Sequence, residues 1–217
     1  MSTRFAPGTV IEEVALFPLP EVVLFPGTLL PLHIFEPRYR KMTEDVLAGS
    51  KLIVPVLVPD PGAVDRRGNP VVVDVAGLGE IVQHRRHSDG RFDLILVGRA
   101  RVRLTELPFV HPYRRARAEV LACSHGDGAN VTGLVSSATR FATRVREVDD
   151  RLKFEVPTDL SPGLLYDACA HALVIDGDER QSVLEALDVR ERIRRCSEYL
   201  AVQEALLGRS SDIKNLN

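Results

Sequence analysis

The sequence predicts an α+β protein in which a strand-rich N-terminal region is followed by a helical C-terminal region. In the N-terminal part, short apolar or β-branched runs alternate with Pro, Gly, Asp and Asn, which is typical of strands joined by turns. In the C-terminal part, apolar residues recur every three or four positions, the period of a helix packed on one face. We therefore expect a β-rich subdomain over 10–121, a helical subdomain over 129–207 and a flexible polar tail over 208–217.

The strand-rich region is expected to form a small barrel or a folded sheet. In Arg101-Val102-Arg103-Leu104 charged and aliphatic residues alternate, which predicts a half-buried strand whose arginines face water. Gly90 in Ser88-Asp89-Gly90 can take the positive φ of a tight turn, so the flanking segments are expected to pair antiparallel. The expected strands are residues 14–17, 29–34, 52–58, 71–75, 78–84, 92–97 and 102–107.

One helix is expected within the strand-rich region, and the others follow it. Pro37 suits the first turn of a helix and Gly49 suits its end. Further along, Ser161-Pro162 reads as a cap followed by a first-turn proline, and Asp188 with Glu191 resembles a capping box. The expected helices are residues 36–48, 131–152 and 161–175, and a last helix in two pieces that begin near 178 and at 188.

The composition excludes several classes of protein. Of the 217 residues 45% are hydrophobic and 27% charged, with a net charge of −2, so neither a disordered chain nor a general nucleic-acid or membrane partner is indicated. Cys123, Cys169 and Cys196 are odd in number and far apart, so we expect reduced thiols and no disulfide framework or CxxC pair. No signal peptide and no run long enough to span a membrane is recognisable. We expect a cytoplasmic protein.

Six short motifs follow one another along the chain: Leu16-Phe17-Pro18-Leu19, Val22-Val23-Leu24-Phe25-Pro26-Gly27, Leu30-Pro31-Leu32-His33-Ile34-Phe35-Glu36-Pro37-Arg38-Tyr39, Gly79-Glu80-Ile81-Val82, Asp89-Gly90-Arg91 and Leu184-Glu185-Ala186-Leu187-Asp188. In their order and spacing they resemble the LON substrate-binding domain family, named for the N-terminal domain of the ATP-dependent Lon protease. The resemblance covers roughly residues 10–206 and is most specific up to Tyr39. It implies a PUA-like β pseudo-barrel with one helix, followed by a C-terminal α-helical bundle.

The resemblance also implies a polypeptide-recognition module rather than an enzyme. No GxxxxGK[ST] phosphate loop occurs, since Gly49-Ser50-Lys51 lacks the preceding glycine and the following hydroxyl, and no Ser-Lys protease domain follows the helical region. We therefore expect the stand-alone form of the family, a non-enzymatic adaptor or sensor linked to protein quality control. Its expected partners are unfolded or flexible polypeptide segments, with an ATP-dependent protease as a further candidate, and no cofactor is expected.

No catalytic residue and no metal ligand is predicted. Cys123-Ser124-His125 and Cys169-Ala170-His171 come nearest to a nucleophile with a base. In the second motif the two residues lie two apart on a helix and point to different faces, so they share neither a proton nor a ligand. Buried thiols and ordinary histidines account for both motifs.

An arginine-rich stretch between residues 84 and 117 offers a basic face at Arg85, Arg99, Arg101 and Arg103. On a PUA-like barrel such a face could contact RNA phosphates, which gives the alternative function of an RNA-binding module. Few aromatic residues accompany the arginines, although stacking on bases usually needs them. The plain alternative is a solvated strand face, and nucleic acid is the less favoured partner.

The stretch FPGTLLPLHIFEPRY, residues 25–39, is expected to be mainly architectural. Pro26-Gly27 suits a tight turn, Pro31 suits an edge strand or a bulge because it has no N–H to donate, and Pro37 begins the helix. If this stretch contacts a ligand, we expect the contact where strand gives way to helix. The candidate peptide-binding corner consists of Phe35, Glu36, Arg38 and Tyr39.

Overall fold

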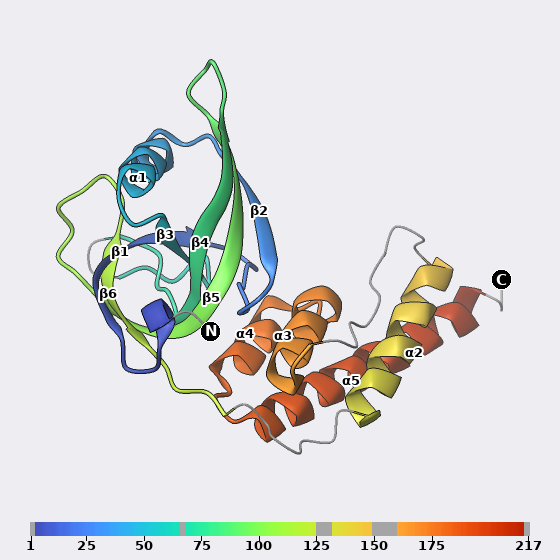
Figure 1. Ribbon diagram of the computed structural model, residues 1–217. Helices are drawn as coiled ribbons and strands as arrows, with labels where there is room; N and C mark the ends of the chain where they lie inside the picture. The colour runs from blue at the N-terminus through green and yellow to red at the C-terminus, as the bar shows by residue number, and fades with distance from the viewer. Residues whose placement is uncertain (1–2, 66–67, 125–131, 149–159, 215–217) are drawn as a thin grey trace. The chain divides into compact units, whose positions relative to one another are not determined.

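The structure, a computed structural model, describes residues 3–65, 68–124, 132–148 and 160–214. The chain divides into two compact units, Met1–Ala122 and Cys123–Asn217, and each is described by itself. In Figure 1 the first unit runs from blue to green and carries the strands, whereas the second runs from yellow to red and is helical where it is described. The mixed α+β architecture predicted from the sequence is confirmed.

Six strands of the first unit form one sheet in the order β2-β5-β4-β3-β1-β6, and an additional pairing of β5 with β6 closes it. The strands β5, β4, β3, β1 and β6 thereby form a ring, and β2 joins it through β5 alone among the described strands. The pair β1 and β3 is parallel, and the other pairs are antiparallel. The strands are β1 (Val10–Leu19), β2 (Leu29–Ile34), β3 (Leu52–Leu57), β4 (Val75–Arg86), β5 (Phe92–Glu106) and β6 (Arg115–Val120).

The closure depends on the length of β5, which has 15 residues. Its first part pairs with β2, from Ile34↔Phe92 to Leu29↔Val97, and its last part pairs with β6, from Val102↔Val120 to Glu106↔Ala116. Along the opposite edge β5 pairs with β4 from Phe92 to Arg103. Figure 1 shows β4 and β5 as a long twisted pair that rises to the hairpin turn, with β2 beside it. One strand therefore serves two neighbours in succession along the same edge.

Alternate residues of the strands face two separate apolar cores, as the period of two requires. Val14 and Leu16 of β1 belong to a core made by the ring strands, which is rich in alanine. Ala15, between them, and Phe17, beyond them, belong to a second core with Tyr39 and Met42 of helix α1 (Pro37–Ala48). β3 is buried along its whole length because it contributes to both cores.

The segment that follows β1 crosses directly over two glycines of the sheet. Leu24 and Phe25 are fully buried, and a Cβ added at Gly77 would stand 1.8 Å from the carbonyl oxygen of Leu24. A Cβ added at Gly98 would stand 2.0 Å from the carbonyl oxygen of Phe25. The chain can approach the strands this closely only because both positions lack a side chain.

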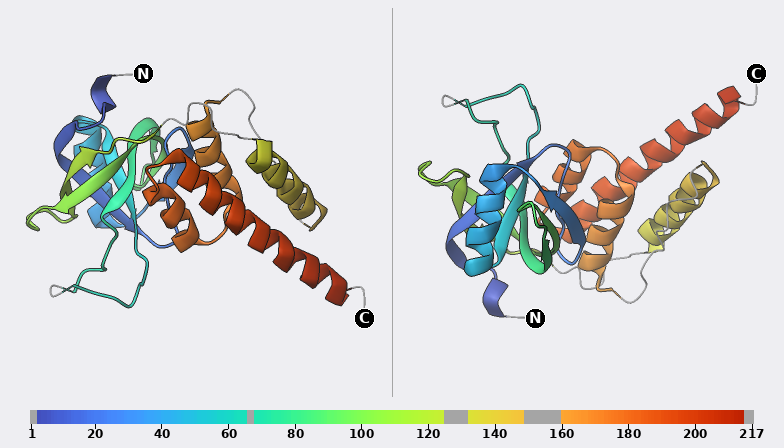
Figure 2. Two further views of the ribbon diagram at one scale, coloured as in Figure 1. Left: turned by 90° about the horizontal axis from the view of Figure 1, so that it is seen from below. Right: turned by 90° about the horizontal axis from the view of Figure 1, so that it is seen from above.

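The second unit consists of helices that pack on α5 (Val189–Lys214). Asp176 caps α4, since its Oδ1 accepts from the N–H groups of Asp178 at 2.9 Å and Glu179 at 3.0 Å. In Figures 1 and 2 helix α2 lies alongside the C-terminal half of α5, and α3 and α4 lie nearer its N-terminal half. The other helices are α2 (Thr132–Val148), α3 (Pro162–Leu173) and α4 (Gly177–Glu185). None of the described helices is long and apolar enough to cross a membrane.

Several local predictions are confirmed. The hairpin at residues 88–90 joins antiparallel strands, and Gly90 has φ 84°. Pro31 lies in β2, which pairs on one side only among the described strands. Helix α1 begins at Pro37 and ends before Gly49.

Other local predictions are wrong. Residues 71–74 are not a strand, because Val71 and Val73 donate their N–H groups to loop and strand-end carbonyls instead of a ladder. The two strands expected over 92–107 are one continuous strand, β5, and β6 was not predicted at all. α5 continues to Lys214, and the flexibility expected over 208–217 stays a prediction. The end of the helix expected over 131–152 lies outside the described residues.

Candidate functional site

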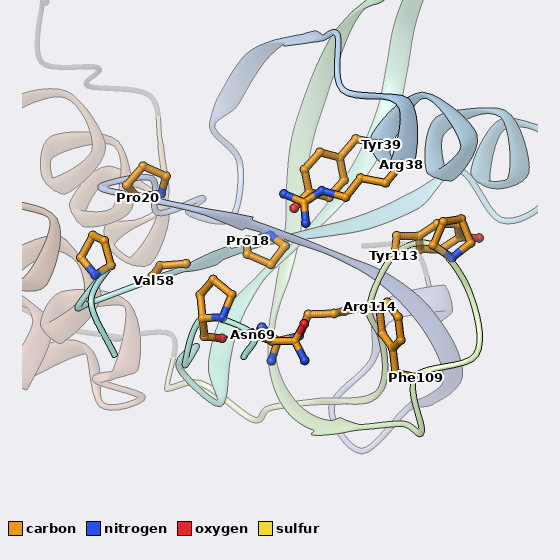
Figure 3. A pocket seen from close by; sticks show the side chains of 12 residues that line it. Pro18, Pro20, Arg38, Tyr39, Val58, Asn69, Phe109, Tyr113 and Arg114 are labelled. Carbon is orange, nitrogen blue, oxygen red and sulfur yellow. Dashed lines mark hydrogen bonds between the residues drawn. The ribbon is translucent and has the colours of Figure 1, made fainter. Parts of the chain in front are cut away.

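The first unit contains a cavity of about 270 Å³ between β1, the start of α1 and two loops. Figure 3 shows its side chains converging from these elements, with Pro18 near the centre. We call it the proline-lined cavity, because five of its lining residues are prolines. The lining residues are Pro18, Pro20, Arg38, Tyr39, Val58, Pro61, Asn69, Pro70, Phe109, Pro112, Tyr113 and Arg114.

The positions of these residues follow from the local structure. Pro18 lies in β1 directly opposite Val56 of the parallel strand β3, where a missing N–H costs one ladder bond. Arg38 belongs to the first turn of α1, which Pro37 begins. Phe109 lies in the irregular segment between β5 and β6 and is 49% exposed. The cavity therefore combines rigid backbone with one large exposed aromatic ring.

Arg38 and Tyr39 form one wall. The Arg38 guanidinium lies 4.5 Å from the centroid of the Tyr39 ring, and both residues are drawn in Figure 3. Nη2 of Arg38 also lies 2.9 Å from Oε2 of Glu36. Tyr39 is 7% exposed and also packs edge-on against Phe17, with ring centroids 4.6 Å apart. Burial raises the pKa of Tyr39, so this wall presents a neutral phenol and a stacked cation.

Arg114 fixes the opposite wall. It is 8% exposed, and it donates from Nε and Nη2 to the two carboxylate oxygens of Glu106 at 2.8 Å and 2.6 Å. Its Nη1 donates to the carbonyl oxygen of Pro70 at 2.6 Å. The guanidinium is thus occupied by partners within the protein, and it ties the end of β5 to the loop before β4. We expect Arg114 to hold the cavity open rather than to bind a ligand itself.

Tyr113 ties the loop before β6 to α1. Its hydroxyl donates to Oδ2 of Asp45 at 3.0 Å. Burial and this hydrogen bond raise the pKa of Tyr113 to about 12. The phenol is therefore neutral at physiological pH.

Tyr113 is expected to ionise near pH 12. Because the pKa of Tyr113 is raised on folding, the neutral phenol contributes to the stability of the folded protein. This contribution is fully present below about pH 10 and is lost as pH rises through about 12. A spectrophotometric titration of tyrosinate should therefore show an ionisation near pH 12 that Tyr113→Phe removes. If Tyr113→Phe instead removed a tyrosine that ionises near pH 10, the hydrogen bond to Asp45 would not hold in solution.

The family model described as the ATP-dependent protease La (LON) substrate-binding domain matches residues 13–202. The chain belongs to this family. Among curated relatives, it is 27% identical over 214 residues to a Lon protease of Dictyoglomus thermophilum, an alignment that covers 94% of this chain and 26% of that protein. It is 28% identical over 210 residues to a Lon protease of Roseiflexus castenholzii, covering 93% and 25%. The chain thus spans about a quarter of the length of these relatives.

Two solved structures share the fold of this LON domain. One is the N-terminal domain of a Lon protease from the Mycobacterium avium complex, with a TM-score of 0.61, 13% identity, and coverage of 88% of this chain and 98% of that one. The other is a Lon N-terminal domain protein from Xanthomonas campestris, with a TM-score of 0.61, 23% identity and the same coverage. At these identities the likeness concerns the fold alone.

The structure divides the candidate peptide-binding corner of the LON domain into two parts. Arg38 and Tyr39 line the proline-lined cavity, whereas Phe35 and Glu36 do not. Phe35 is 61% exposed and lies against the ring of His33, with centroids 6.3 Å apart. Glu36 reaches the cavity only through its ion pair with Arg38.

The candidate basic face is largely neutralised. Arg85 pairs with Asp93 at 2.6 Å, and Arg99 pairs with Glu80 at 2.7 Å. Arg101 is 3% exposed, so the prediction that it faces water is wrong. Arg103 is exposed.

The cysteine motifs lie in the helical unit of the LON domain. Cys123 is half-buried, and His125 lies outside the described residues. Burial raises the pKa of Cys169 to about 12 and lowers the pKa of His171. Cys169 is therefore a neutral thiol near neutral pH, which does not suit a nucleophile.

Proposed function

We propose that this chain is a polypeptide-recognition module that binds unfolded or flexible segments at the proline-lined cavity. The observation that carries the proposal is the cavity itself, where proline and aromatic side chains of β1, α1 and two loops face an open space. Membership of the LON substrate-binding domain family supports it. In this proposal the chain is a non-enzymatic adaptor or sensor in the cytoplasm, and an ATP-dependent protease is a candidate partner. The closed ring of strands and the helices packed on α5 favour a PUA-like barrel with a helical bundle.

The size and chemistry of the cavity suit part of a peptide. Its volume of about 270 Å³ lies just below the range of roughly 300–1,000 Å³ typical of small-molecule sites. An apolar or aromatic side chain would pack against the proline rings and Phe109, while Arg38 at the rim could stack on it. Contacts of this kind select for apolar character without a fixed sequence, as a binder of unfolded segments requires.

A second route, strand addition at the free edge of β2, is less favoured. Among the described strands β2 has one neighbour, so its outer edge could accept an extended peptide. Pro31 stands in the middle of its six residues and has no N–H to donate. The ladder on that edge would be interrupted, which is how natural edge strands resist such pairing.

Phe109→Ala is expected to weaken binding of an unfolded polypeptide by about tenfold, which corresponds to about 1.4 kcal/mol. The reason is the loss of the largest exposed aromatic surface in the cavity. Fluorescence anisotropy with a labelled, permanently unfolded polypeptide measures the affinity. Phe35→Ala is the matched control, because Phe35 is similarly exposed but does not line the cavity. Equal weakening by the two variants, or none by Phe109→Ala, would contradict the assignment.

The same assay with a generic RNA across a salt series tests the alternative function. The ion pairs of Arg85 and Arg99 with carboxylates and the burial of Arg101 make the RNA-binding alternative less favoured. RNA affinity that exceeds the affinity for polypeptide and falls steeply with salt would overturn the proposal.

A further inference from the structure

Three potential metal ligands converge beside the hairpin that joins β4 to β5. Nδ1 of His33 lies 2.7 Å from Oδ1 of Asp93, and Nε2 of His87 lies 2.8 Å from Oδ2 of the same carboxylate. The ligand atoms of the three residues all lie within 4.8 Å of one another. We call this group the hairpin cluster. None of its members lines the proline-lined cavity.

The backbone holds the hairpin cluster in place from three sides. His33 of β2 and Asp93 of β5 are direct partners in the antiparallel ladder. His87 closes the hairpin, because its N–H donates to the carbonyl oxygen of Arg91 at 2.8 Å. The ligands therefore come from paired strands and a tight turn, which fix their Cα positions without any metal.

We propose that His33, His87 and Asp93 bind a Zn²⁺ ion, with water as the fourth ligand. Two imidazole nitrogens and one carboxylate are a donor set that suits zinc and related first-row metals, whereas Mg²⁺ and Ca²⁺ prefer oxygen ligands alone. Tetrahedral zinc with bonds of roughly 2.0–2.2 Å holds neighbouring ligand atoms about 3.3 Å apart. The two nitrogen–oxygen contacts open by roughly half an ångström, and separations of up to 4.8 Å between ligand atoms close by at most roughly 1.5 Å, which rotation of the partly exposed side chains allows.

Arg85 competes with the ion for this position, and Arg91 lies beside His33. Arg85 donates to Oδ2 of Asp93 from Nε at 3.1 Å and from Nη2 at 2.6 Å, and Nη1 of Arg91 lies 3.4 Å from Nε2 of His33. Both guanidinium groups can turn into water, since the Arg85 and Arg91 side chains are 73% and 47% exposed. Zinc takes over from Arg85 as the counter-charge of Asp93. This competition gives the site a signature that zinc bound elsewhere lacks.

A ring contact also restricts one ligand of the hairpin cluster. The Phe35 ring lies against the His33 ring at an interplanar angle of 24° and limits the freedom of that ligand. Bound zinc would link β2 to the hairpin end of β4 and β5.

Isothermal titration of the full chain with ZnCl₂ tests the proposal. We expect one site per chain, weakened at least about tenfold in His33→Ala and in His87→Ala, because even outer-shell partners contribute that much to metal sites. His84→Ala is the matched control, since His84 is an exposed histidine of β4 outside the cluster. It should bind zinc as the wild type does.

Arg85→Ala supplies the second test, because it leaves all three ligands in place. Removal of the competing guanidinium should tighten zinc binding severalfold, and this holds even if a histidine variant fails to fold. Unchanged or weaker binding in Arg85→Ala overturns the proposal. So does the absence of a zinc site in the wild type at metal concentrations well above that of the protein, or a site that depends on His84 instead. Peptide binding at the cavity is independent of each of these results.

Discussion

Gly98→Ala is expected to lower the free energy of unfolding by about 3 kcal/mol or more, the upper end of what overpacking costs. The added Cβ would lie 2.0 Å from the oxygen and 2.7 Å from the carbon of the Phe25 carbonyl, and both are rigid backbone atoms. Neither β5 nor the segment before β2 can move away easily, because hydrogen bonds join the two. The Gly98 N–H donates to Thr28 at 3.0 Å, and its carbonyl accepts from Gly27 at 2.8 Å.

Chemical denaturation followed by circular dichroism measures this effect. Gly62→Ala is the matched control in the same unit, because Gly62 is exposed and an added Cβ would meet only the Asp60 side chain, at 3.2 Å. It should change stability by less than about 0.5 kcal/mol. Equal stability of Gly98→Ala and the wild type would mean that the segment before β2 does not cross the sheet at this point.

Arg192→Met is expected to destabilise the helical unit by about 3–5 kcal/mol. The side chains of Arg192 and Asp167 are each only 2% exposed, and Nη1 lies 3.5 Å from Oδ1. Nη2 also donates to the carbonyl oxygen of Ser124 at 3.0 Å. Methionine fills a similar volume but removes the counter-charge, so the carboxylate of Asp167 would remain buried beside an apolar side chain.

A double variant separates the charge effect from packing. In Asp167→Asn with Arg192→Met no charge is left at this position, so the loss of stability should be smaller than in Arg192→Met alone. Arg190→Met on the exposed side of α5 is the control and should stay within about 0.5 kcal/mol of the wild type. A double variant that is less stable than Arg192→Met would show that packing, rather than the buried charge, dominates.

The elements that the sequence predicts well carry their signals locally. Helix α1 begins at Pro37 and ends before Gly49, two residues whose backbone preferences act without help from the rest of the fold. The hairpin at Gly90 and the edge position of Pro31 follow from equally local rules. The family resemblance also rests on short local sequence motifs, and the match of the family model over residues 13–202 confirms it.

The errors occur where tertiary contacts decide the structure. β6 was missed because its buried residues include Ala116 and Ala118, both fully buried but too small to stand out as a strand pattern. Alternation along 101–104 predicts an exposed Arg101, yet its side chain is only 3% exposed in the folded chain. The glycine contact at Gly98 has no sequence signal of its own, because the approaching chain lies more than sixty residues earlier.

In the candidate site, too, residues with a local sequence signal could be predicted and residues placed by tertiary contacts could not. Arg38 and Tyr39 could be predicted because they lie at a visible transition from strand to helix. Phe109 and Tyr113 could not, since they reach the cavity only when the loop between β5 and β6 folds back toward α1. The hairpin cluster was also missed, because strand register, and not spacing along the chain, places His33 opposite Asp93.

The most direct test of polypeptide recognition at the proline-lined cavity is a nuclear magnetic resonance titration. The isotope-labelled chain would be titrated with an unfolded polypeptide while amide and methyl shifts are followed. We predict that the largest shift changes fall on Val58, Phe109 and Tyr113, with little change along the hairpin of β4 and β5. Changes concentrated on that hairpin or on the free edge of β2, or no change at saturating peptide, would contradict the account.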